Sequence, residues 1–236
     1  MGIMVVLAGA PAALAATYTS PAGTVRAGVN YLSLPAMPGS TDPAVLFAGI
    51  PLDGKISYWC RQTQEWHVYP TSWPPTEPFM WHMGYRLEAD QDYTITFQGN
   101  QPPSLRSTCL TPIAAGYAFV SQPYDFEAFF ADFLFESSRN PGVKVSTVQA
   151  AANGWIEPYL IEGAQDSGVH ITLDGAGGTS TTVKPWHGYW VKSKVGPPQG
   201  DKLTIYWPTV AAPEPATLAV LGVGGLALLR RRARRA

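Results

Sequence analysis

The sequence predicts a mainly β protein with two degenerate β-rich repeats, sandwich-like subdomains that each carry a short helix, followed by a C-terminal hydrophobic helix. Composition is the first support: 23 glycines and 22 prolines among 236 residues favour many turns over long helices. Charged residues make up only 14% of the chain and aromatic residues 12%, a balance typical of β-sheet proteins outside the cell. The third support is internal, because residues 16–100 and 116–210 share a sequence pattern.

Both repeats begin in the same way. Residues 28–35 and 116–123 each contain a glycine, a strand-like run with an aromatic residue in fourth place, and then Ser-x-Pro. A helix is expected after each: residues 41–50, opened by Asp42 as N-cap and a proline as first helical residue, and residues 124–136, where Phe and Leu recur at helical spacing.

Paired strands complete each repeat. Residues 55–60 and 65–69 flank a short polar turn and predict a hairpin. The second repeat is expected to contain an equivalent hairpin at 143–149 and 154–160. Both repeats then contain a Trp-His segment, at 81–86 and 186–190, and a closing strand, at 93–97 and 203–207. The second repeat also carries an insertion at 162–181, with an extra strand at 169–173. Since a few short strands bury little apolar surface alone, we expect the two copies to pack together or share a sheet.

Residues 101–115 form the predicted linker between the repeats, and one of the two cysteines, Cys109, lies in it. In an oxidising compartment two cysteines favour one disulfide, here Cys60–Cys109. The bridge would close a loop of about 49 residues and stabilise the fold by roughly 3–4 kcal/mol. The alternative is two unpaired thiols.

The first residues predict export. Residues 1–15 are apolar and end in Ala13-Leu14-Ala15, the small-x-small pattern of a secretory cleavage site, so we interpret them as a signal peptide. The usual basic n-region is missing; either export tolerates its absence or the true start codon lies upstream, and we favour the second explanation. A buried first strand is the weaker alternative, because Pro11 and five alanines suit a strand poorly.

The last residues, 212–236, carry three features in order. Pro213, Glu214 and Pro215 hold the backbone extended and exposed. Residues 216–229 contain no charge, and five arginines follow at once: Arg230, Arg231, Arg232, Arg234 and Arg235. An apolar span ending in arginines predicts a membrane stop with the arginines on the cytoplasmic side. At about 1.5 Å per residue the span reaches roughly 21 Å, short of the ~30 Å hydrocarbon core, and arginine snorkelling narrows that gap.

This order of parts resembles the PEP-CTERM sorting signal of Gram-negative bacteria. In that family a Pro-Glu-Pro motif precedes one hydrophobic helix and an Arg-rich tail, and an exosortase processes the signal during export. The resemblance implies two partners, exosortase and, transiently, the inner membrane, and a final location at the cell surface or in the extracellular matrix. It also implies an association with exopolysaccharide or biofilm. Ala212 stands where the family commonly has valine.

No enzyme is expected from the rest of the chain, and no cofactor or metal. The four histidines, His67, His82, His170 and His187, lack the spacing of a zinc site, and no Gly-x-Ser-x-Gly elbow occurs. Five of the 16 basic residues lie in the tail and Glu214 is one of 17 acidic residues, so the exported segment keeps 11 basic against 16 acidic residues. Nucleic acid is therefore not an expected partner.

Aromatic residues are the better functional lead. The chain has eight tryptophans, and Trp73 lies among prolines on a predicted loop, where an exposed indole face would stack on a sugar ring. The alternative function is thus a carbohydrate-binding module delivered by the same sorting signal, with Trp73 contacting the polysaccharide. Most other tryptophans are interpreted as core residues, because several recur at equivalent places in both repeats.

Overall fold

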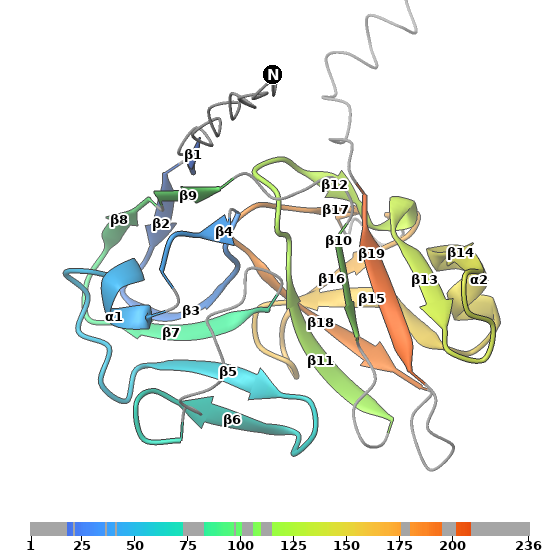
Figure 1. Ribbon diagram of the computed structural model, residues 1–236, viewed down its shortest axis with the longest axis horizontal. Helices are drawn as coiled ribbons and strands as arrows, with labels where there is room; N and C mark the ends of the chain where they lie inside the picture. Colours follow the sequence, from blue (N-terminus) through green and yellow to red (C-terminus); the bar gives the residue numbers. More distant parts are fainter. Residues whose placement is uncertain are drawn as a thin grey trace, which may run out of the picture.

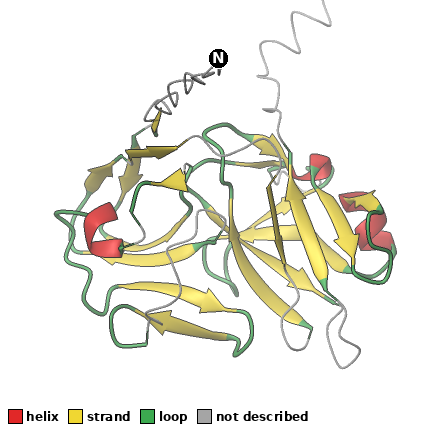
Figure 2. Cartoon of the chain, viewed as in Figure 1, coloured by secondary structure: helices red, strands yellow, loops and turns green. Residues whose placement is uncertain are grey.

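The structure, a computed structural model, describes residues 18–20, 22–35, 37–40, 42–72, 83–96, 98–100, 106–109, 115–175, 180–194 and 202–208. These residues form short antiparallel strands with two short α-helices and one 3-10 helix among them, so the prediction of a mainly β fold is confirmed (Figures 1 and 2). We call residues 18–100 the first half and residues 106–208 the second half.

The elements of the first half are β1 (Tyr18–Thr19), β2 (Gly23–Val25), β3 (Gly28–Leu32), β4 (Met37–Pro38), α1 (Pro43–Leu46), β5 (Ile56–Cys60), β6 (Glu65–Val68), β7 (Tyr85–Ala89), β8 (Tyr93–Ile95) and β9 (Gln98–Asn100). Those of the second half are β10 (Arg106–Cys109), β11 (Gly116–Ser121), β12 (Ala128–Phe129), η1 (Phe130–Asp132), β13 (Leu134–Ser137), β14 (Lys144–Ser146), α2 (Thr147–Ala152), β15 (Ile156–Glu162), β16 (Val169–Thr172), β17 (Thr182–Val183), β18 (Gly188–Ser193) and β19 (Leu203–Trp207).

Two four-stranded sheets correspond in order and register. The first sheet is β3-β7-β5-β6 and the second sheet is β11-β18-β15-β16, and every neighbouring pair in both is antiparallel. Tyr31 of β3 lies opposite Arg86, as Phe119 of β11 lies opposite Trp190. The third strand keeps the same register in both sheets, apart from an irregularity in β15 that contains Pro158, which has no N–H to donate to a ladder.

A third sheet, β10-β19-β13-β14, packs on the second sheet and makes the second half a sandwich. Its inward side chains include Phe135, Ile205 and Trp207, which share one core with Val120, Tyr189 and Leu160 of the second sheet. The core of the first half lies between the first sheet and the β2–β8 pair, which contributes Val25 and Ile95. Each half thus buries its own apolar interior.

The first half follows the predicted elements closely. The hairpin is confirmed as β5 and β6, with Ser57 opposite Val68. The first predicted helix forms as α1, shortened to four residues, and the Asp42 carboxylate accepts a hydrogen bond from the Ala44 N–H at 2.9 Å as its N-cap.

The helix predicted at residues 124–136 is wrong. That segment forms β12, η1 and β13, and β13 is hydrogen-bonded to β14 on one side and to β19 on the other. Both ladders satisfy its backbone groups, while Phe135 and Ser137 point inward and Leu134 is exposed, a period of two rather than of a helix. The short helix of this half is α2, capped by Ser146 and rich in alanine.

The hairpin predicted at 143–149 and 154–160 is also wrong. β14 pairs with β13 in the third sheet, and β15 pairs with β16 and β18 in the second. The strand that was assigned to an insertion, β16, therefore holds the place in the second sheet that β6 holds in the first. The predicted linker also differs, because its residues Arg106–Cys109 form β10, which pairs with β19.

Candidate functional site

The two halves meet along a cluster of aromatic side chains, which we call the seam. Its buried members are Phe119, Ile161 and Trp190, and Tyr31, Trp59, Trp66, Tyr117 and Tyr159 pack against them. Ring centroids of Trp59 and Trp190 lie 5.1 Å apart and those of Tyr31 and Phe119 5.9 Å apart, both edge to face. Such contacts hold one half against the other through packing rather than through a shared sheet.

Backbone contacts reinforce the seam. Single β-bridges join Leu32 to His187 and Met83 to Val120, and the Trp59 indole donates a hydrogen bond to the Tyr117 carbonyl at 3.0 Å. At Gly188 an added Cβ would lie 2.4 Å from Phe119 Cζ and 3.0 Å from the Leu32 carbonyl oxygen. Glycine therefore leaves room beside β18 for the Phe119 ring of the neighbouring strand β11 and for the Leu32 carbonyl of the first half.

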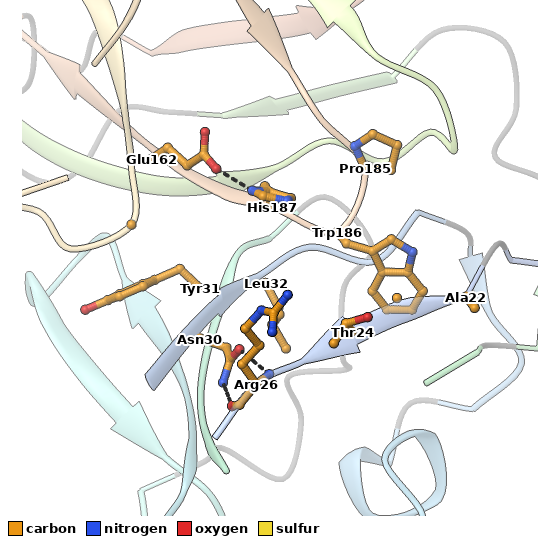
Figure 3. A pocket seen from close by; sticks show the side chains of 12 residues that line it. Ala22, Thr24, Arg26, Asn30, Tyr31, Leu32, Glu162, Pro185, Trp186 and His187 are labelled. Carbon is orange, nitrogen blue, oxygen red and sulfur yellow. Dashed lines mark hydrogen bonds and ion pairs between the residues drawn. The ribbon is translucent and has the colours of Figure 1, made fainter. Parts of the chain in front are cut away.

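A cavity of about 560 Å³ lies beside the seam, and we call it the seam cavity. Its walls come from both halves: Arg26, Asn30 and Tyr31 on β3 and the turn before it, and Glu162, Trp186 and His187 from the end of β15 and the segment leading into β18. Figure 3 shows Glu162 and His187 on one side, with Tyr31, Asn30 and Arg26 facing them and Trp186 at one end.

Trp186 has an unusual backbone conformation. Its φ is +68°, in the left-handed region that bulky side chains seldom adopt. The Trp186 carbonyl accepts a hydrogen bond from the Ser33 N–H at 3.0 Å, and its indole lies so close to Gly23 that a Cβ there would be 2.4 Å from the ring. Contacts with the first half thus hold this residue in its costly conformation at the cavity wall.

Glu162 and His187 form a hydrogen-bonded pair on the opposite wall. The hydrogen bond from His187 lowers the pKa of the Glu162 carboxyl, the positive charge of Lys184 also lowers it, and partial burial opposes both effects. Glu162 is therefore ionised at neutral pH, and Nδ1 of His187 donates to its Oε1. Among the described residues, no side chain or backbone group donates to the second carboxylate oxygen, Oε2.

Arg26 lies on a turn that Asn30 holds in place. The Asn30 side chain accepts a hydrogen bond from the Arg26 N–H at 2.9 Å and donates one to the Arg26 carbonyl at 2.7 Å. The Arg26 side chain is 78% exposed, and its guanidinium lies 3.8 Å from the Asp92 carboxylate, which is also exposed. An exposed pair at this distance contributes little, so the Arg26 side chain keeps most of its donors for other partners.

Two other described histidines, His67 and His170, have local partners. His67 is hydrogen-bonded to the Tyr58 hydroxyl at 3.0 Å, and His170 stacks on Tyr159 with centroids 4.3 Å apart. Within the described ranges, no group of three or more His, Cys, Asp or Glu side chains is placed to hold a metal ion. His187, by contrast, lines the seam cavity.

Several predicted site residues lie outside the described residues. They are Trp73, His82, the sorting motif Pro213, Glu214 and Pro215, and the arginines Arg230, Arg231, Arg232, Arg234 and Arg235. The predicted helix at 216–229 is also outside, and no helix in the described part of the chain is long and apolar enough to cross a membrane.

Of the two cysteines, the structure describes the side chain of Cys60. This residue is buried, and its thiol is free and donates a hydrogen bond to Gln62 Oε1 at 3.2 Å. The side chain of Cys109 lies outside the described residues, so the Cys60–Cys109 disulfide stays a prediction.

The cavity residues were missed by sequence reasoning. Trp186 was interpreted as a packing residue, Glu162 as the edge of an insertion and Tyr31 as part of a repeated strand, while Arg26 carried no motif. One signal was present: the consecutive Pro185-Trp186-His187 places a rigid residue, an aromatic ring and a titratable group directly before a strand. These residues lie near Arg26 and Tyr31 only because the two halves pack together along the seam, and no local sequence pattern predicts that packing.

Comparison with known proteins identifies the C-terminal segment. Residues 211–235 match the family model of the PEP-CTERM protein-sorting motif, which confirms the resemblance found in the sequence. The motif implies exosortase-targeted export, with exosortase as the processing partner and a C-terminal membrane-anchoring signal. Neither a curated protein nor a solved structure matches the chain.

Proposed function

We propose that this protein is a non-catalytic, exosortase-processed component of the cell surface or extracellular matrix, associated with exopolysaccharide or biofilm. The observation that carries the proposal is the PEP-CTERM motif at residues 211–235. The mildly acidic exported segment and the apolar residues 1–15 agree with export. In this proposal the apolar run at 216–229 anchors the chain transiently in the inner membrane, with the arginines on the cytoplasmic side.

The folded part supports processing near the motif. The last described strand, β19 (Leu203–Trp207), closes the core of the second half with Ile205 and Trp207, and the motif begins only a few residues later at Pro213. Cleavage between residues 213 and 216 would therefore remove no residue of either core. The sorting signal acts as an address, and both halves are delivered intact.

The test is the intact mass of the protein recovered from a host that has an exosortase and from the same host without it. With exosortase we expect loss of residues 1–15 and of everything beyond about Pro213 to Ala216. Replacing Glu214 with Ala should leave the tail attached, whereas Glu157→Ala, in the folded part, should be processed normally. A recovered mass that retains the arginine tail in the presence of exosortase would contradict the processing proposal.

We also propose that the two halves contain two copies of one ancestral sheet. The supporting observations are the equal strand order and register of the first and second sheets. The bridges across the seam are reciprocal as well: Leu32 and Val120 hold equivalent places in β3 and β11, and each pairs with the segment entering the other half's next strand, at His187 and Met83.

The second candidate function is a carbohydrate-binding module on the same sorting signal. The observation that favours it is the seam cavity, whose volume of about 560 Å³ falls within the ~300–1,000 Å³ typical of small-molecule sites. Tyr31 and Trp186 both line it. Binding of the full chain to a panel of polysaccharides tests this candidate, and absence of binding to every member would exclude it while leaving the sorting proposal intact.

A further inference from the structure

We propose that the seam cavity binds a neutral sugar unit of a polysaccharide, with Trp186 and Tyr31 as aromatic walls and Glu162 and Arg26 as hydrogen-bonding partners of its hydroxyls. This inference rests on the carbohydrate-binding function proposed above and assigns it to a site other than the loop of Trp73. The walls come from β3 and the turn before it, from the end of β15 and from the segment before β18 (Figure 3).

The aromatic walls suit a sugar ring because its C–H faces are apolar while its rim is polar. Trp186 and Tyr31 are both half-buried, so each presents part of its ring to the cavity while the rest is fixed by packing. Gly23 packs closely against the Trp186 indole, and Phe119 and Trp66 contact the Tyr31 ring. Rings that are already ordered lose little side-chain entropy when a ligand binds.

The polar groups suit hydroxyls because the cavity offers both acceptors and donors. Oε2 of Glu162 is an acceptor that no described residue occupies, and its carboxylate stays charged beside His187. The Arg26 guanidinium supplies several N–H donors and is loosely held. A sugar hydroxyl can donate a hydrogen bond to Oε2 of Glu162 and accept one from the Arg26 guanidinium. A group that only accepts hydrogen bonds can pair with Arg26 but not with Glu162.

Charge excludes strongly anionic ligands from the proposal. The Glu162 carboxylate faces the same cavity as Arg26, so a phosphate or carboxylate drawn to the guanidinium would also meet a fixed negative charge. The described lining holds one arginine and one carboxylate–imidazole pair rather than a cluster of cations. These opposite charges favour a neutral saccharide over a phosphorylated or uronic one.

The conformation of Trp186 is an independent pointer to the same site. A left-handed φ is unfavourable at a bulky residue such as Trp186, and residues in such conformations cluster at ligand clamps and active sites. The Ser33 hydrogen bond and the contact with Gly23 hold the ring at the cavity wall in spite of that cost.

The experiment is isothermal titration of the full chain, purified in a detergent without a sugar headgroup, against cellobiose, maltose, xylobiose and a galacturonic acid disaccharide. The variants are Glu162→Gln and Arg26→Ala. The matched control is Glu157→Gln, because Glu157 also lies on β15, is about as exposed as Glu162 and forms an ion pair with Lys194, but does not line the cavity. Trp73→Ala tests the loop site, and thermal unfolding verifies that each variant is folded.

We expect at least one neutral disaccharide to bind, and both cavity variants to weaken its binding by about 10- to 100-fold, since each removes a charged hydrogen-bonding partner. Glu157→Gln and Trp73→Ala should bind like the original protein. If Trp73→Ala abolishes binding and the cavity variants do not, the site is wrong but carbohydrate binding stands. Preference for the galacturonic acid disaccharide overturns the neutral ligand, and no binding to any of the four overturns the saccharide proposal itself.

Discussion

The close fit of Gly188 against the Phe119 ring of β11 and the Leu32 carbonyl of the first half predicts the effect of a substitution in the seam. Alanine at this position would place its Cβ 2.4 Å from Phe119 Cζ and 3.0 Å from the Leu32 carbonyl oxygen, whereas carbon atoms in ordinary contact are about 3.5–4.0 Å apart. The ring or β18 must therefore move by roughly 1 Å. The φ of Gly188 is not left-handed, so the cost comes from crowding rather than from the backbone.

The magnitude follows from two opposing effects. Overpacking of this kind costs about 1–3 kcal/mol, while replacing glycine by alanine restricts the unfolded chain and returns about 0.4–1 kcal/mol. We therefore expect Gly188→Ala to lower the free energy of unfolding by roughly 1.3 kcal/mol, within limits of about 0 and 2.6 kcal/mol. Urea unfolding followed by tryptophan fluorescence measures this loss as a lower midpoint with an unchanged slope.

A double-mutant cycle identifies the cause. Phe119→Leu removes the Cζ atom that Gly188→Ala would meet, so the two changes together should cost less than their sum. At Gly84 an added Cβ would lie 2.5 Å from Phe119 Cδ1, and leucine keeps a carbon near that place, so Phe119→Leu should rescue Gly84→Ala less well. A Gly188→Ala protein within about 0.5 kcal/mol of the original that also shows no coupling to Phe119→Leu would refute the close contact between Gly188 and Phe119.

Two further predictions concern single groups. The pKa of Glu162 is lowered in the folded protein, so its contribution to stability is fully present above the ordinary carboxyl pKa and is lost as pH falls through the lowered value. Glu162→Gln should therefore reduce the fall of the unfolding midpoint on the acid side of a pH series. An unchanged acid side would contradict this prediction. The buried Thr147 hydroxyl is 2.8 Å from the Phe130 carbonyl and 3.1 Å from the Phe133 carbonyl, so Thr147→Val should cost about 1–3 kcal/mol in urea unfolding, whereas exposed Thr94→Val should cost far less. Equal losses at the two threonines would rule out the hydrogen-bonding role.

Local sequence signals predicted the elements that are decided locally. Asp42 before a proline marked the start of α1, and the apolar runs around a short polar turn marked β5 and β6. In these segments the capping group or the partner strand lies within about ten residues, so the pattern contains most of the interactions that decide the structure.

Prediction failed where distant partners decide the structure. The phenylalanines between residues 126 and 135 have helical spacing, yet β19, nearly 70 residues away, draws Leu134–Ser137 into a strand because two ladders satisfy its backbone. β16 looked like an insertion because its equivalence to β6 lies in sheet order and register, which the sequences no longer share. The predicted hairpin partner of β15, at residues 143–149, is wrong for the same reason, since β15 pairs with β16 and β18.

The sequence by itself determined the sorting signal and the β class. The PEP-CTERM signal is a contiguous string whose parts act in chain order, and composition alone favours turns and strands over long helices. The seam cavity was decided only by the tertiary structure. Tyr31 and His187 are separated by more than 150 residues in the sequence, and they line the same cavity because aromatic packing joins the two halves there. Such a cavity depends on which distant parts of the chain pack against each other, and that is determined by the packing of the whole chain.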